Sequence, residues 1–387
     1  MTRWQINPEE ITQFLQEMVR IDSVNPGLVN GAAGETQIAA WLAQTCRDLG
    51  LDVELQETAP NRPNVIARWK GGRDGKSLLL TGHTDVVSVE NMQRDPFDGH
   101  IENGKLYGRG ALDMKGGLAS ILGAVTALQS GGFTPAGDLW LGFVTDEENF
   151  SIGTDALVKK IQPDAAILTE PTNLDICIAH KGFAWATITT HGTAAHGSLH
   201  DVGVDAVAHM GRILNALETL NRDRFPQQNH PLLGRPSVHA GTIHGGTGAS
   251  IYPHLCRLIV EHRLLPDETP EQVVAIWNTI IEDQKRADPS FNATVTLDFS
   301  RPGYQIDPQA PIVQTLSNAY RTITKREPAL IGMKAWLDSA ILSRAGVPTV
   351  IIGPGGEGMH AAVEYVELDT VFACAEILAE TTARWIG

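Results

Sequence analysis

The sequence predicts an α/β protein in which a mostly parallel sheet with flanking helices is interrupted by a second, smaller α+β domain. Short apolar runs typical of buried strands alternate with amphipathic helical segments over most of the chain. Between residues 182 and 295 the order of elements changes, and the alternation then resumes. The length of 387 residues also exceeds that of one ordinary domain. We therefore expect one domain formed by residues 1–181 and 296–387, with residues 182–295 inserted into it.

Composition narrows the class of protein. The chain is 42% hydrophobic and 19% charged, which fits a globular protein with a large core. A formal net charge of −15 argues against a nucleic-acid partner, because phosphate backbones require clustered Lys and Arg. There is no N-terminal apolar signal and no uninterrupted apolar run long enough for a bilayer. Four scattered cysteines without a Cys-x-x-Cys motif suggest free thiols in a reducing compartment. We expect a cytoplasmic protein without a membrane partner.

The N-terminal elements are two helices and two strands. Asn7 and Pro8 form a typical helix start, with Asn7 as the N-cap and an apolar stripe beyond it. A second helix is expected over residues 36–49. Residues 52–55 and 64–69 read as strands, and a glycine-rich turn follows.

The most informative strand lies within residues 77–85, where three leucines stand in a row. It ends at Gly82, so His83 and Asp85 follow directly. In open α/β sheets, ligands bind beyond the carboxyl ends of the strands. Taken alone, His-x-Asp is equally compatible with a polar turn, so the other strand ends decide its meaning.

Acidic residues follow the next elements. A long polar loop over residues 90–110 leads to Asp113, which precedes an apolar helix and could be a simple helix cap or a ligand. The strand at residues 139–144 ends in the three acids of positions 146–148. Like charges side by side are costly unless a cation neutralises them, so a metal ion explains these acids better than surface charge does.

The remaining strands of this domain also end in candidate ligands. Residues 165–168 form a strand that ends at Glu170. Residues 347–352 form another, followed by a glycine-rich turn and His360. A helix over residues 369–382 closes the chain. Because the carboxyl ends of parallel strands meet at one edge, these side chains are expected close together.

The inserted segment has a different order of elements, strand–helix–strand–strand–helix–strand, which is that of a ferredoxin-like domain. Its strands alternate between apolar and polar residues, and its helices carry apolar stripes. The expected elements are a strand at 183–191, a helix at 205–220, strands at 237–244 and 255–265, a helix from Thr269 onward, and a strand at 293–299.

Two histidines and several carboxylates thus gather at one sheet edge. Imidazole and carboxylate together suit zinc, cobalt or manganese. Five such side chains exceed the needs of one open catalytic zinc and fit two ions that share a bridging carboxylate and a water. One further acid would then serve as the general base.

These strand-end segments also carry a family resemblance. Over essentially its whole length, the chain resembles the M20 family of metallo-amidohydrolases, which includes acetylornithine deacetylase, succinyl-diaminopimelate desuccinylase, aminoacylase and glutamate carboxypeptidase. The resemblance implies a zinc-exopeptidase-like catalytic domain. The matching segments are Gly82–Asp85, Gly108–Gly117, Asp146–Glu148, Glu170–Pro171, and His360 with Glu364–Val366.

The resemblance implies two zinc ions per subunit, with cobalt or manganese as possible substitutes. Asp113 would bridge both ions. His83 and Glu170 would complete one site, and Glu148 and His360 the other.

The resemblance also assigns residues that do not bind the metal. Asp85 would orient the imidazole of His83, as metal-bound histidines generally require. Glu147 would be the general base, which takes a proton from water and returns it to the leaving amine. The family often has a cis peptide after the bridging aspartate, here between Asp113 and Met114.

By the same resemblance, the inserted domain is a lid and dimerisation domain. His196 would reach the active site of the neighbouring subunit and stabilise the tetrahedral oxyanion. Arg263 would bind the substrate carboxylate with its fork of donors. Ser250 and Asp338 would also contact substrate. The chain departs from the common family pattern at Ser250, where Asn is usual, and at Leu337, where Thr is usual.

The expected function is hydrolysis of the N-acyl amide of a small amino acid or derivative by a homodimer. An acetylornithine deacetylase-like activity is the leading prediction. A succinyl-diaminopimelate desuccinylase is the close alternative, followed by an aminoacylase or dipeptidase. A catalytically silent relative that only binds ligands is the remote alternative.

Overall fold

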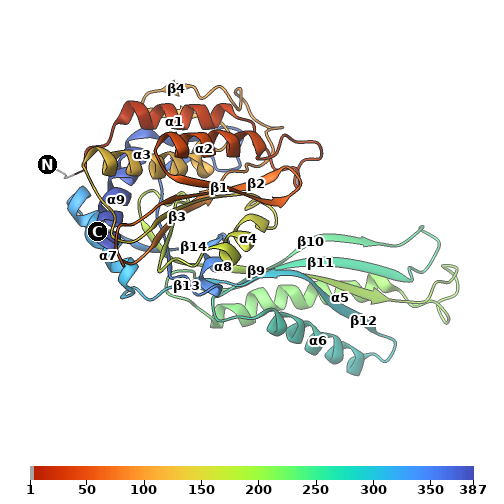
Figure 1. Ribbon diagram of the computed structural model, residues 1–387. Coiled ribbons are helices and arrows are strands. Elements are labelled where there is room, and N and C mark those ends of the chain that lie inside the picture. The colour runs from red at the N-terminus through yellow and green to blue at the C-terminus, as the bar shows by residue number, and fades with distance from the viewer. Residues whose placement is uncertain (1–3) are drawn as a thin grey trace. The chain divides into compact units, whose positions relative to one another are not determined.

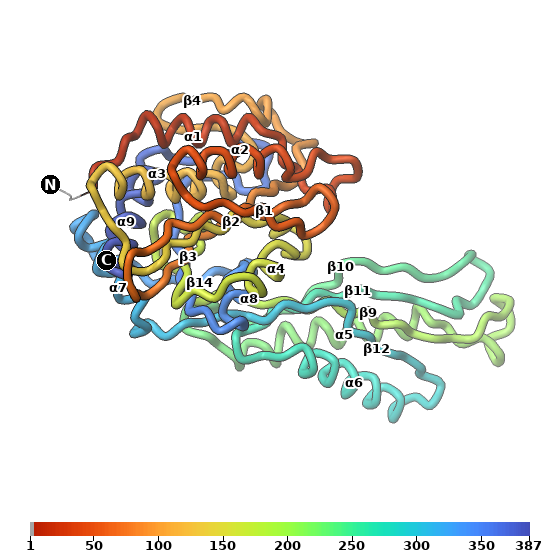
Figure 2. Tube along the Cα trace, in the orientation of Figure 1, coloured from red at the N-terminus to blue at the C-terminus, as the bar shows by residue number. Residues whose placement is uncertain are grey.

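The computed structural model describes residues 4–387, and the chain divides into two compact units. Unit 1 comprises residues up to Ile178 together with Ile306–Ile331 and Leu337–Gly387. Unit 2 comprises Ala179–Gln305 and the short segment Gly332–Trp336. The colours of Figure 2 follow the chain from unit 1 into the green and cyan segments of unit 2 and back.

The sheet of unit 1 has a parallel centre, as predicted. Strands β6, β3, β7 and β15 pair in parallel, whereas the flanking pairs are antiparallel. The strand order is β1-β2-β6-β3-β7-β15-β8, and β14 pairs with β8. Strand β13, at the end of unit 2, pairs with Ala179 and His180 of β8, which also belong to unit 2. The bounds are β1 (Asp52–Ala59), β2 (Arg62–Trp69), β3 (Leu78–His83), β6 (Leu139–Val144), β7 (Ala166–Leu168), β8 (Ile176–His180), β13 (Tyr304–Gln305), β14 (Leu330–Met333) and β15 (Thr349–Ile351).

Helices cover both faces of this sheet (Figure 1). Helices α1, α2 and α3 lie on one side, and α4 and α8 on the other. On the second side, Leu79 of β3 packs with Leu157 of α4 and Leu342 of α8. The bounds are α1 (Pro8–Arg20), α2 (Thr36–Asp48), α3 (Gly116–Ser130), α4 (Ile152–Lys160), α7 (Pro311–Thr324), α8 (Ser339–Arg344) and α9 (Leu368–Ile386).

The start of α1 illustrates how local sequence sets an element. The Asn7 side chain accepts hydrogen bonds from the backbone N–H groups of Glu9 and Glu10, as an N-cap should. Pro8 occupies the first turn, where its missing N–H costs nothing. The predicted helix start is therefore confirmed.

Helix α3 is the core helix of unit 1. Together with the turn before it, the segment Ala111–Ser130 is long and apolar enough to cross a membrane by length and composition, but its most apolar stretch is completely buried within the protein. All four cysteines are buried and free, in agreement with the reading of their spacing.

A small antiparallel sheet corrects one prediction. The segment 90–110 was expected to be an irregular loop, but it contains β4 (Ile101–Glu102) and β5 (Lys105–Tyr107). These pair with β17 (Tyr365–Glu367) and β16 (Gly356–Glu357) in the order β16-β17-β5-β4. Strands of two or three residues are too short to show a periodicity. The sheet matters because it ties the chain just before Asp113 to the chain just after His360.

Unit 2 has the predicted strand–helix order. Its antiparallel sheet runs β10-β11-β9-β12. Alternate residues of β9 are buried, and Ile188 packs with Met210 and Trp277 from the two helices. The elements are β9 (Gly182–His191), α5 (Ala206–Thr219), short helical turns at Leu220–Arg224 and Phe225–Gln227, β10 (Ser237–Gly245), β11 (Leu255–Leu264), α6 (Pro270–Ala287) and β12 (Asn292–Arg301).

The predicted boundary at 295/296 is wrong by ten residues, because it would cut through β12. That strand pairs with β9 from Asn292 to Arg301, and the compact unit ends at Gln305. The first boundary, predicted at 181/182, lies at 178/179. Strand β8, which the sequence reading missed, occupies this junction.

Candidate metal centre

The predicted ligands of unit 1 come from different elements and meet at the carboxyl edge of its sheet. His83 ends β3, and Asp113 lies in the turn Ala111–Lys115 that precedes α3. Glu148 follows β6, Glu170 follows β7, and His360 lies between β16 and β17. Their ligand atoms form two groups, His83–Asp113–Glu170 and Asp113–Glu148–His360, with all atoms of each group within 4.8 Å of one another.

Asp113 is the member that both groups share. Its Oδ1 lies 3.1 Å from Nε2 of His83, and its Oδ2 lies 3.1 Å from Nε2 of His360. The two oxygens of one carboxylate therefore face two separate imidazoles. Glu170 Oε1 lies 3.8 Å from His83 Nε2, and Glu148 Oε1 lies 3.1 Å from His360 Nε2. This arrangement is what a carboxylate between two cations requires.

The backbone around Asp113 is held by the buried carboxylate of Glu364, for which no role was predicted from the sequence. Glu364 Oε1 accepts hydrogen bonds from the N–H groups of Leu112 and Asp113, at 3.0 and 3.1 Å. Its Oε2 accepts a hydrogen bond of 2.6 Å from Nη1 of Arg109. The peptide between Asp113 and Met114 is cis, as the resemblance implied. Glu364 is thus a missed residue that fixes the bridging position.

Close packing against β3 also depends on a glycine. A side chain at Gly82 would meet the Met114 side chain at 2.5 Å and that of Leu118 at 2.7 Å. A Cβ at this position would push these two side chains aside, so the glycine lets β3 lie this close to the start of α3. The Gly-His pair of the sequence motif therefore has a packing reason as well as a chemical one.

Asp85 acts differently from the expectation in one respect. Nδ1 of His83 lies 2.9 Å from the backbone carbonyl oxygen of Asp85 and 3.7 Å from its carboxylate, so the carbonyl is the nearer partner. The carboxylate instead accepts the backbone N–H groups of Glu147 and Glu148, at 3.1 and 3.2 Å. Asp85 thereby connects the His83 strand end to the acidic turn after β6.

Burial raises the pKa values of the acids around Asp113. It raises the pKa of Glu148 to about 7, and it raises the pKa values of Glu147 and Glu170 well above the usual carboxyl range. Neighbouring carboxylates add to the shift for each of these groups. Acids that are buried side by side in this way are stabilised by a cation between them.

The pKa values of Asp113 and of its two histidine neighbours shift toward the charged forms instead. Burial would raise the pKa of Asp113, but hydrogen bonds with His360 and His83 lower it below the usual range. Hydrogen bonds to Asp113 and Glu148 raise the pKa of His360 to about 10. Burial opposes protonation of His83, yet its carboxylate neighbours raise its pKa well above the ordinary value. In the metal-free protein, imidazole protons therefore balance the acids, and divalent ions would displace them.

The donor set fits two divalent ions. Imidazole nitrogens and carboxylate oxygens are the ligands that zinc and its neighbours bind. Oε1 of Glu170 is buried and has no hydrogen-bond partner among the described residues. Such an atom is costly unless a cation lies beside it. His83, Asp113 and Glu170 would hold one ion, and Asp113, Glu148 and His360 the other.

Glu147 lies next to this group without belonging to it. Its backbone N–H is held by Asp85, whereas its half-buried carboxylate has no hydrogen bond to any described residue. Burial raises the pKa of Glu147, the charges of Glu170 and Asp338 raise it further, and the charge of His83 opposes the shift. Glu147 is therefore held at the backbone and keeps its carboxylate available.

The structure places the remaining predicted residues as follows. Asp338 belongs to unit 1, is buried, and accepts a hydrogen bond of 2.6 Å from Thr154 Oγ1. His196, Ser250 and Arg263 belong to unit 2. The exposed His196 and Ser250 lie on neighbouring loops, because Gly197 donates a backbone hydrogen bond of 2.8 Å to Ser250.

Arg263 is already paired. Its Nη2 lies 2.6 Å from Oε1 of Glu261 on the same strand, and its guanidinium lies 5.7 Å from the ring centre of Phe183. A substrate carboxylate would have to share this guanidinium with Glu261.

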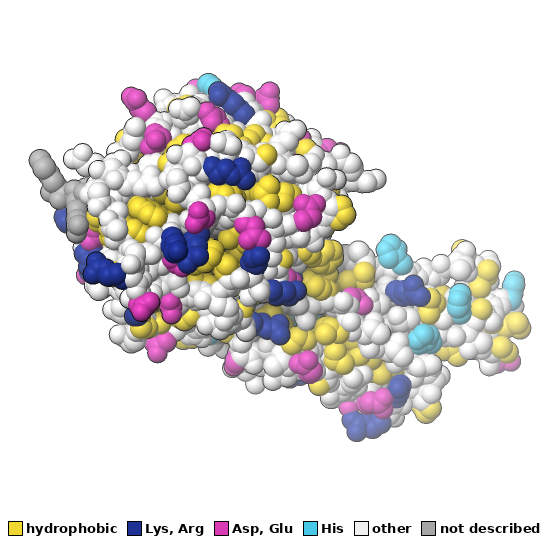
Figure 3. Space-filling model, in the orientation of Figure 1, with side chains coloured by type: hydrophobic (Ala, Val, Ile, Leu, Met, Phe, Trp, Pro, Cys, Tyr) yellow, Lys and Arg dark blue, Asp and Glu magenta, His cyan; other side chains and the backbone are white. Residues whose placement is uncertain are grey.

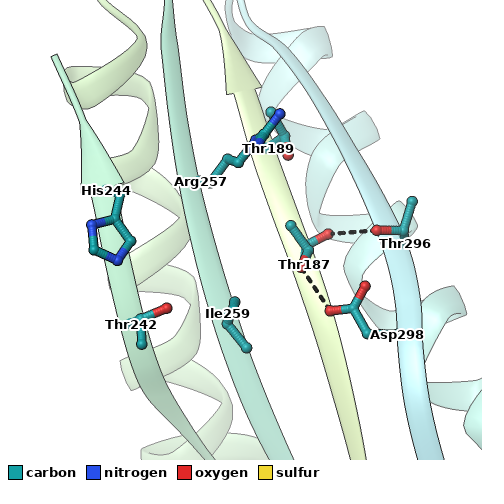
Figure 4. A pocket seen from close by; sticks show the side chains of 8 residues that line it. All are labelled: Thr187, Thr189, Thr242, His244, Arg257, Ile259, Thr296 and Asp298. Carbon is teal, nitrogen blue, oxygen red and sulfur yellow. Dashed lines mark hydrogen bonds between the residues drawn. The ribbon is translucent and has the colours of Figure 1, made fainter. Parts of the chain in front are cut away.

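Unit 2 also carries an open cavity of about 630 Å³ on the face of its sheet (Figure 4). Figure 4 shows threonines from three strands beside Arg257, His244 and Asp298. Thr187 Oγ1 donates a hydrogen bond of 2.6 Å to Asp298. None of the residues predicted to act on a substrate lines this cavity.

A comparison with protein families identifies the chain's relatives. The model of "Peptidase family M20/M25/M40" matches residues 79–384. The chain is 27% identical to N-formyl-4-amino-5-aminomethyl-2-methylpyrimidine deformylase from Halalkalibacterium halodurans, over 98% of this chain and 95% of that protein. It is 28% identical to acetylornithine deacetylase from Myxococcus xanthus, over 96% of this chain and 97% of that protein.

Solved structures share the fold. Aminopeptidase PepT from Bacillus cereus matches 99% of this chain and 100% of its own, with a TM-score of 0.82 and 21% identity. The YXEP protein of Bacillus subtilis, described as a dinuclear metal binding peptidase, matches 98% of both chains with a TM-score of 0.74 and 15% identity.

Proposed function

The chain belongs to peptidase family M20/M25/M40, and from this premise we propose that it is a two-zinc deacylase that removes a small N-acyl group from an amino acid or a related amine. Amide-bond hydrolysis is the activity that its family relatives share. The observation that carries the proposal is Asp113, whose two oxygens face His83 and His360 at equal distances of 3.1 Å. A pair of metal ions at this position would supply a nucleophilic water near neutral pH and polarise the amide carbonyl.

Glu147 is the proposed general base. Its carboxylate takes a proton from the attacking water and later gives it to the leaving nitrogen. Two features support the assignment: the backbone is fixed by Asp85 at 3.1 Å, and the carboxylate is not engaged by a described residue. Burial raises the pKa of Glu147, so the carboxylate is a stronger base than an exposed one.

Unit 2 is proposed to complete the site in a homodimer. His196 is exposed, with its Nδ1 2.9 Å from Ser198 Oγ, which leaves Nε2 available to donate to a developing oxyanion. Arg263 is proposed to hold a substrate carboxylate in competition with Glu261. Ser250 and Asp338 remain proposed substrate contacts, and a cytoplasmic location remains part of the proposal.

The acyl group is proposed to be acetyl or formyl. The acetylornithine deacetylases and the formyl-aminopyrimidine deformylases resemble this chain to nearly the same degree, at 27–29% identity. Acetylornithine deacetylase-like activity remains the leading candidate. The deformylases add a second candidate that was not predicted from the sequence. The deformylase of Halalkalibacterium halodurans matches 98% of this chain.

Hydrolysis of a panel of amides tests this proposal. The panel contains N-acetylornithine, N-formyl-4-amino-5-aminomethyl-2-methylpyrimidine, N-succinyl-diaminopimelate, N-acetylmethionine and a dipeptide, each with zinc or cobalt and with a chelator as the control. We expect one dominant, chelator-sensitive substrate with an acetyl or formyl group. Dominant hydrolysis of the succinyl compound or the dipeptide would contradict the acyl-group assignment. No turnover by the zinc-loaded protein would contradict the deacylase proposal.

A further inference from the structure

A buried set of polar side chains lies behind the candidate metal centre and contains no proposed ligand. It consists of Asn25, Asp85, Asp146, Arg62 and Glu35, and we call it the Asn25 network. All five residues are at most 9% exposed. Burial of so many charged groups is costly unless every one is paired, so their arrangement needs an explanation.

Asn25 is the link between two carboxylates. Its Nδ2 donates a hydrogen bond of 2.7 Å to Oδ2 of Asp85 and one of 3.0 Å to Oδ1 of Asp146. Its Oδ1 accepts a hydrogen bond of 2.8 Å from the backbone of Gly27, which fixes the orientation of the amide. The amide therefore uses both of its hydrogens to join the His83 strand end to the acidic turn.

The segment around Asn25 is itself held in place. The backbone N–H of Asn25 donates to the carbonyl of Val86 at 2.9 Å, and Val86 donates to Ser23 at 3.0 Å. Val24 and Val86 form a parallel bridge. Asn25 is thus attached to the chain directly after His83 and Asp85, and its side chain reaches from there to Asp146.

Asp146 sets the shape of the turn that carries the acids. Its φ of 69° is left-handed, a conformation that non-glycine residues rarely adopt. The turn is closed by hydrogen bonds from the N–H of Ser151 to the Asp146 carbonyl, at 2.6 Å, and from the N–H of Phe150 to Oδ2, at 3.2 Å. The backbone carbonyl and the side chain of Asp146 therefore both hold the turn that carries Glu147 and Glu148.

Arg62 supplies the only cation of the network. Its Nη1 donates a hydrogen bond of 2.7 Å to Asp146 Oδ1, and its other face pairs with both oxygens of Glu35, one of them at 2.9 Å. Glu35 is completely buried. The guanidinium is thereby locked, and it holds the Asp146 carboxylate in one orientation.

From these contacts we infer that Asn25 and Asp146 are positioning residues for the general base. Asn25 aligns Asp85, whose two oxygens receive the N–H groups of Glu147 and Glu148. Asp146 bends the chain so that both acids leave the turn at the sheet edge. Among the described residues, neither side chain is hydrogen-bonded to a proposed ligand side chain. The catalytic role of the turn rests on the proposed function, whereas the holding of the turn does not.

Asn25→Leu tests the inference, because leucine has a similar size and no hydrogen-bonding group. We expect kcat to fall by about ten- to a hundredfold with KM nearly unchanged, as is usual when a supporting partner of a metal site is lost. Hydrogen–deuterium exchange of the metal-free protein gives a second measurement that needs no activity. The amides of Glu147 and Glu148 should exchange at least about tenfold faster, because their acceptor Asp85 is no longer held.

Asn221→Leu is the matched control. Asn221 is a partly buried asparagine of unit 2 whose amide holds both the carbonyl and the N–H of Val238. Its substitution should lower thermal stability without changing kcat or the exchange at Glu147. If Asn25→Leu does not fold, Asp146→Ala and Asp146→Asn replace it. The asparagine keeps one acceptor oxygen and tolerates a left-handed φ, so we expect exchange to rise less in this variant than in the alanine variant.

Each result has a distinct meaning. Faster exchange confined to the turn supports the inference, even if no substrate is found. Unchanged exchange and unchanged kcat in a folded Asn25→Leu protein would overturn it. Faster exchange throughout unit 1 would also overturn it, because Asn25 would then be a general stabiliser. An inactive wild-type protein with the expected local exchange would reject the proposed function and leave the inference standing.

Discussion

The two units treat their charged residues in opposite ways. Unit 1 buries Glu35, Asp85, Asp146 and Glu364 almost completely and holds each with specific donors. On the sheet face of unit 2, polar side chains such as Arg257 and Thr187 line an open cavity, and histidines appear at its surface in Figure 3. Burial makes a charge costly and shifts its pKa, whereas a solvated charge is screened by water and its pKa shifts less. The contrast supports the proposal that the metal-dependent step takes place in unit 1.

Removal of the proposed base should have the largest effect. Glu147→Gln keeps the side-chain shape but cannot accept a proton from water. We expect kcat to fall by about a hundred- to ten-thousandfold. The metal content, measured by elemental analysis, should stay that of the wild type because Glu147 is not a proposed ligand. Unchanged turnover would show that Glu147 is not the general base. The contrast in charge burial between the two units would then have no link to catalysis.

The next largest effect should come from the ion pair behind Asp113. Arg109→Met leaves the completely buried Glu364 carboxylate without its guanidinium partner. Loss of one partner of a buried pair costs about 3–5 kcal/mol of folding free energy. Urea unfolding measures the change.

The control for this variant is Arg222→Met in unit 2. Arg222 pairs with Asp223 at 2.8 Å, and both side chains are largely exposed. We expect no measurable change in unfolding for this variant. Equal destabilisation by the two substitutions would remove the distinction between buried and solvated charge on which the comparison depends.

One buried group of unit 2 should make its stability depend on pH. His262 accepts a hydrogen bond of 2.8 Å from Trp277 Nε1, and burial lowers its pKa to about 4. The folded state therefore binds its proton at lower pH than the unfolded chain, whose histidine titrates near 6.5. The contribution of neutral His262 to the unfolding free energy should be fully present above pH 6.5. It should be lost as the pH falls toward 4, which lowers the unfolding free energy by about 3 kcal/mol.

The His262→Gln variant isolates this contribution. Glutamine can still accept from Trp277 but does not titrate, so its unfolding free energy should fall less between pH 7 and pH 4 than that of the wild type. The measurement is urea unfolding at several pH values. Parallel pH profiles of the two proteins would mean that His262 does not titrate as its burial indicates.

The smallest effect is expected on the open face of unit 2. Thr187→Val removes the hydroxyl that donates to the Asp298 carboxylate, in a cavity open to solvent. Water can replace this donor, so the change in unfolding free energy should be below about 1 kcal/mol. We also expect kcat to stay unchanged on the best substrate of the panel. A clear loss of activity would show that this cavity takes part in substrate binding.

The sequence predicted the parts of the fold that have a strong local signal. The leucine run of β3 was recognisable because consecutive apolar residues are typical of a buried parallel strand. The acids after β6 were recognisable because adjacent like charges are costly without a cation. The meeting of Asp113 with His360 was expected from the resemblance, but its physical cause was not. It depends on the pairing of Tyr107 with Tyr365, between two three-residue strands.

Other features had no signal in the sequence. Asn25 stands alone before a proline, and nothing local shows that its amide reaches Asp85 and Asp146. The pair of Arg62 and Glu35 likewise forms only through the fold. The nearer contact of His83 with the Asp85 carbonyl depends on backbone geometry that a motif does not specify. Residues that support a site are therefore harder to predict from the sequence than the residues that form it.

Metal titration of the metal-free protein tests the central claim most directly. Isothermal titration with zinc should give two ions per chain, because Asp113 faces two separate ligand groups. The Asp113→Ala variant removes the ligand that both groups share and should bind fewer ions, each more weakly. A wild-type stoichiometry of one ion, or an Asp113→Ala protein that still binds two ions with undiminished affinity, would contradict the shared-carboxylate centre.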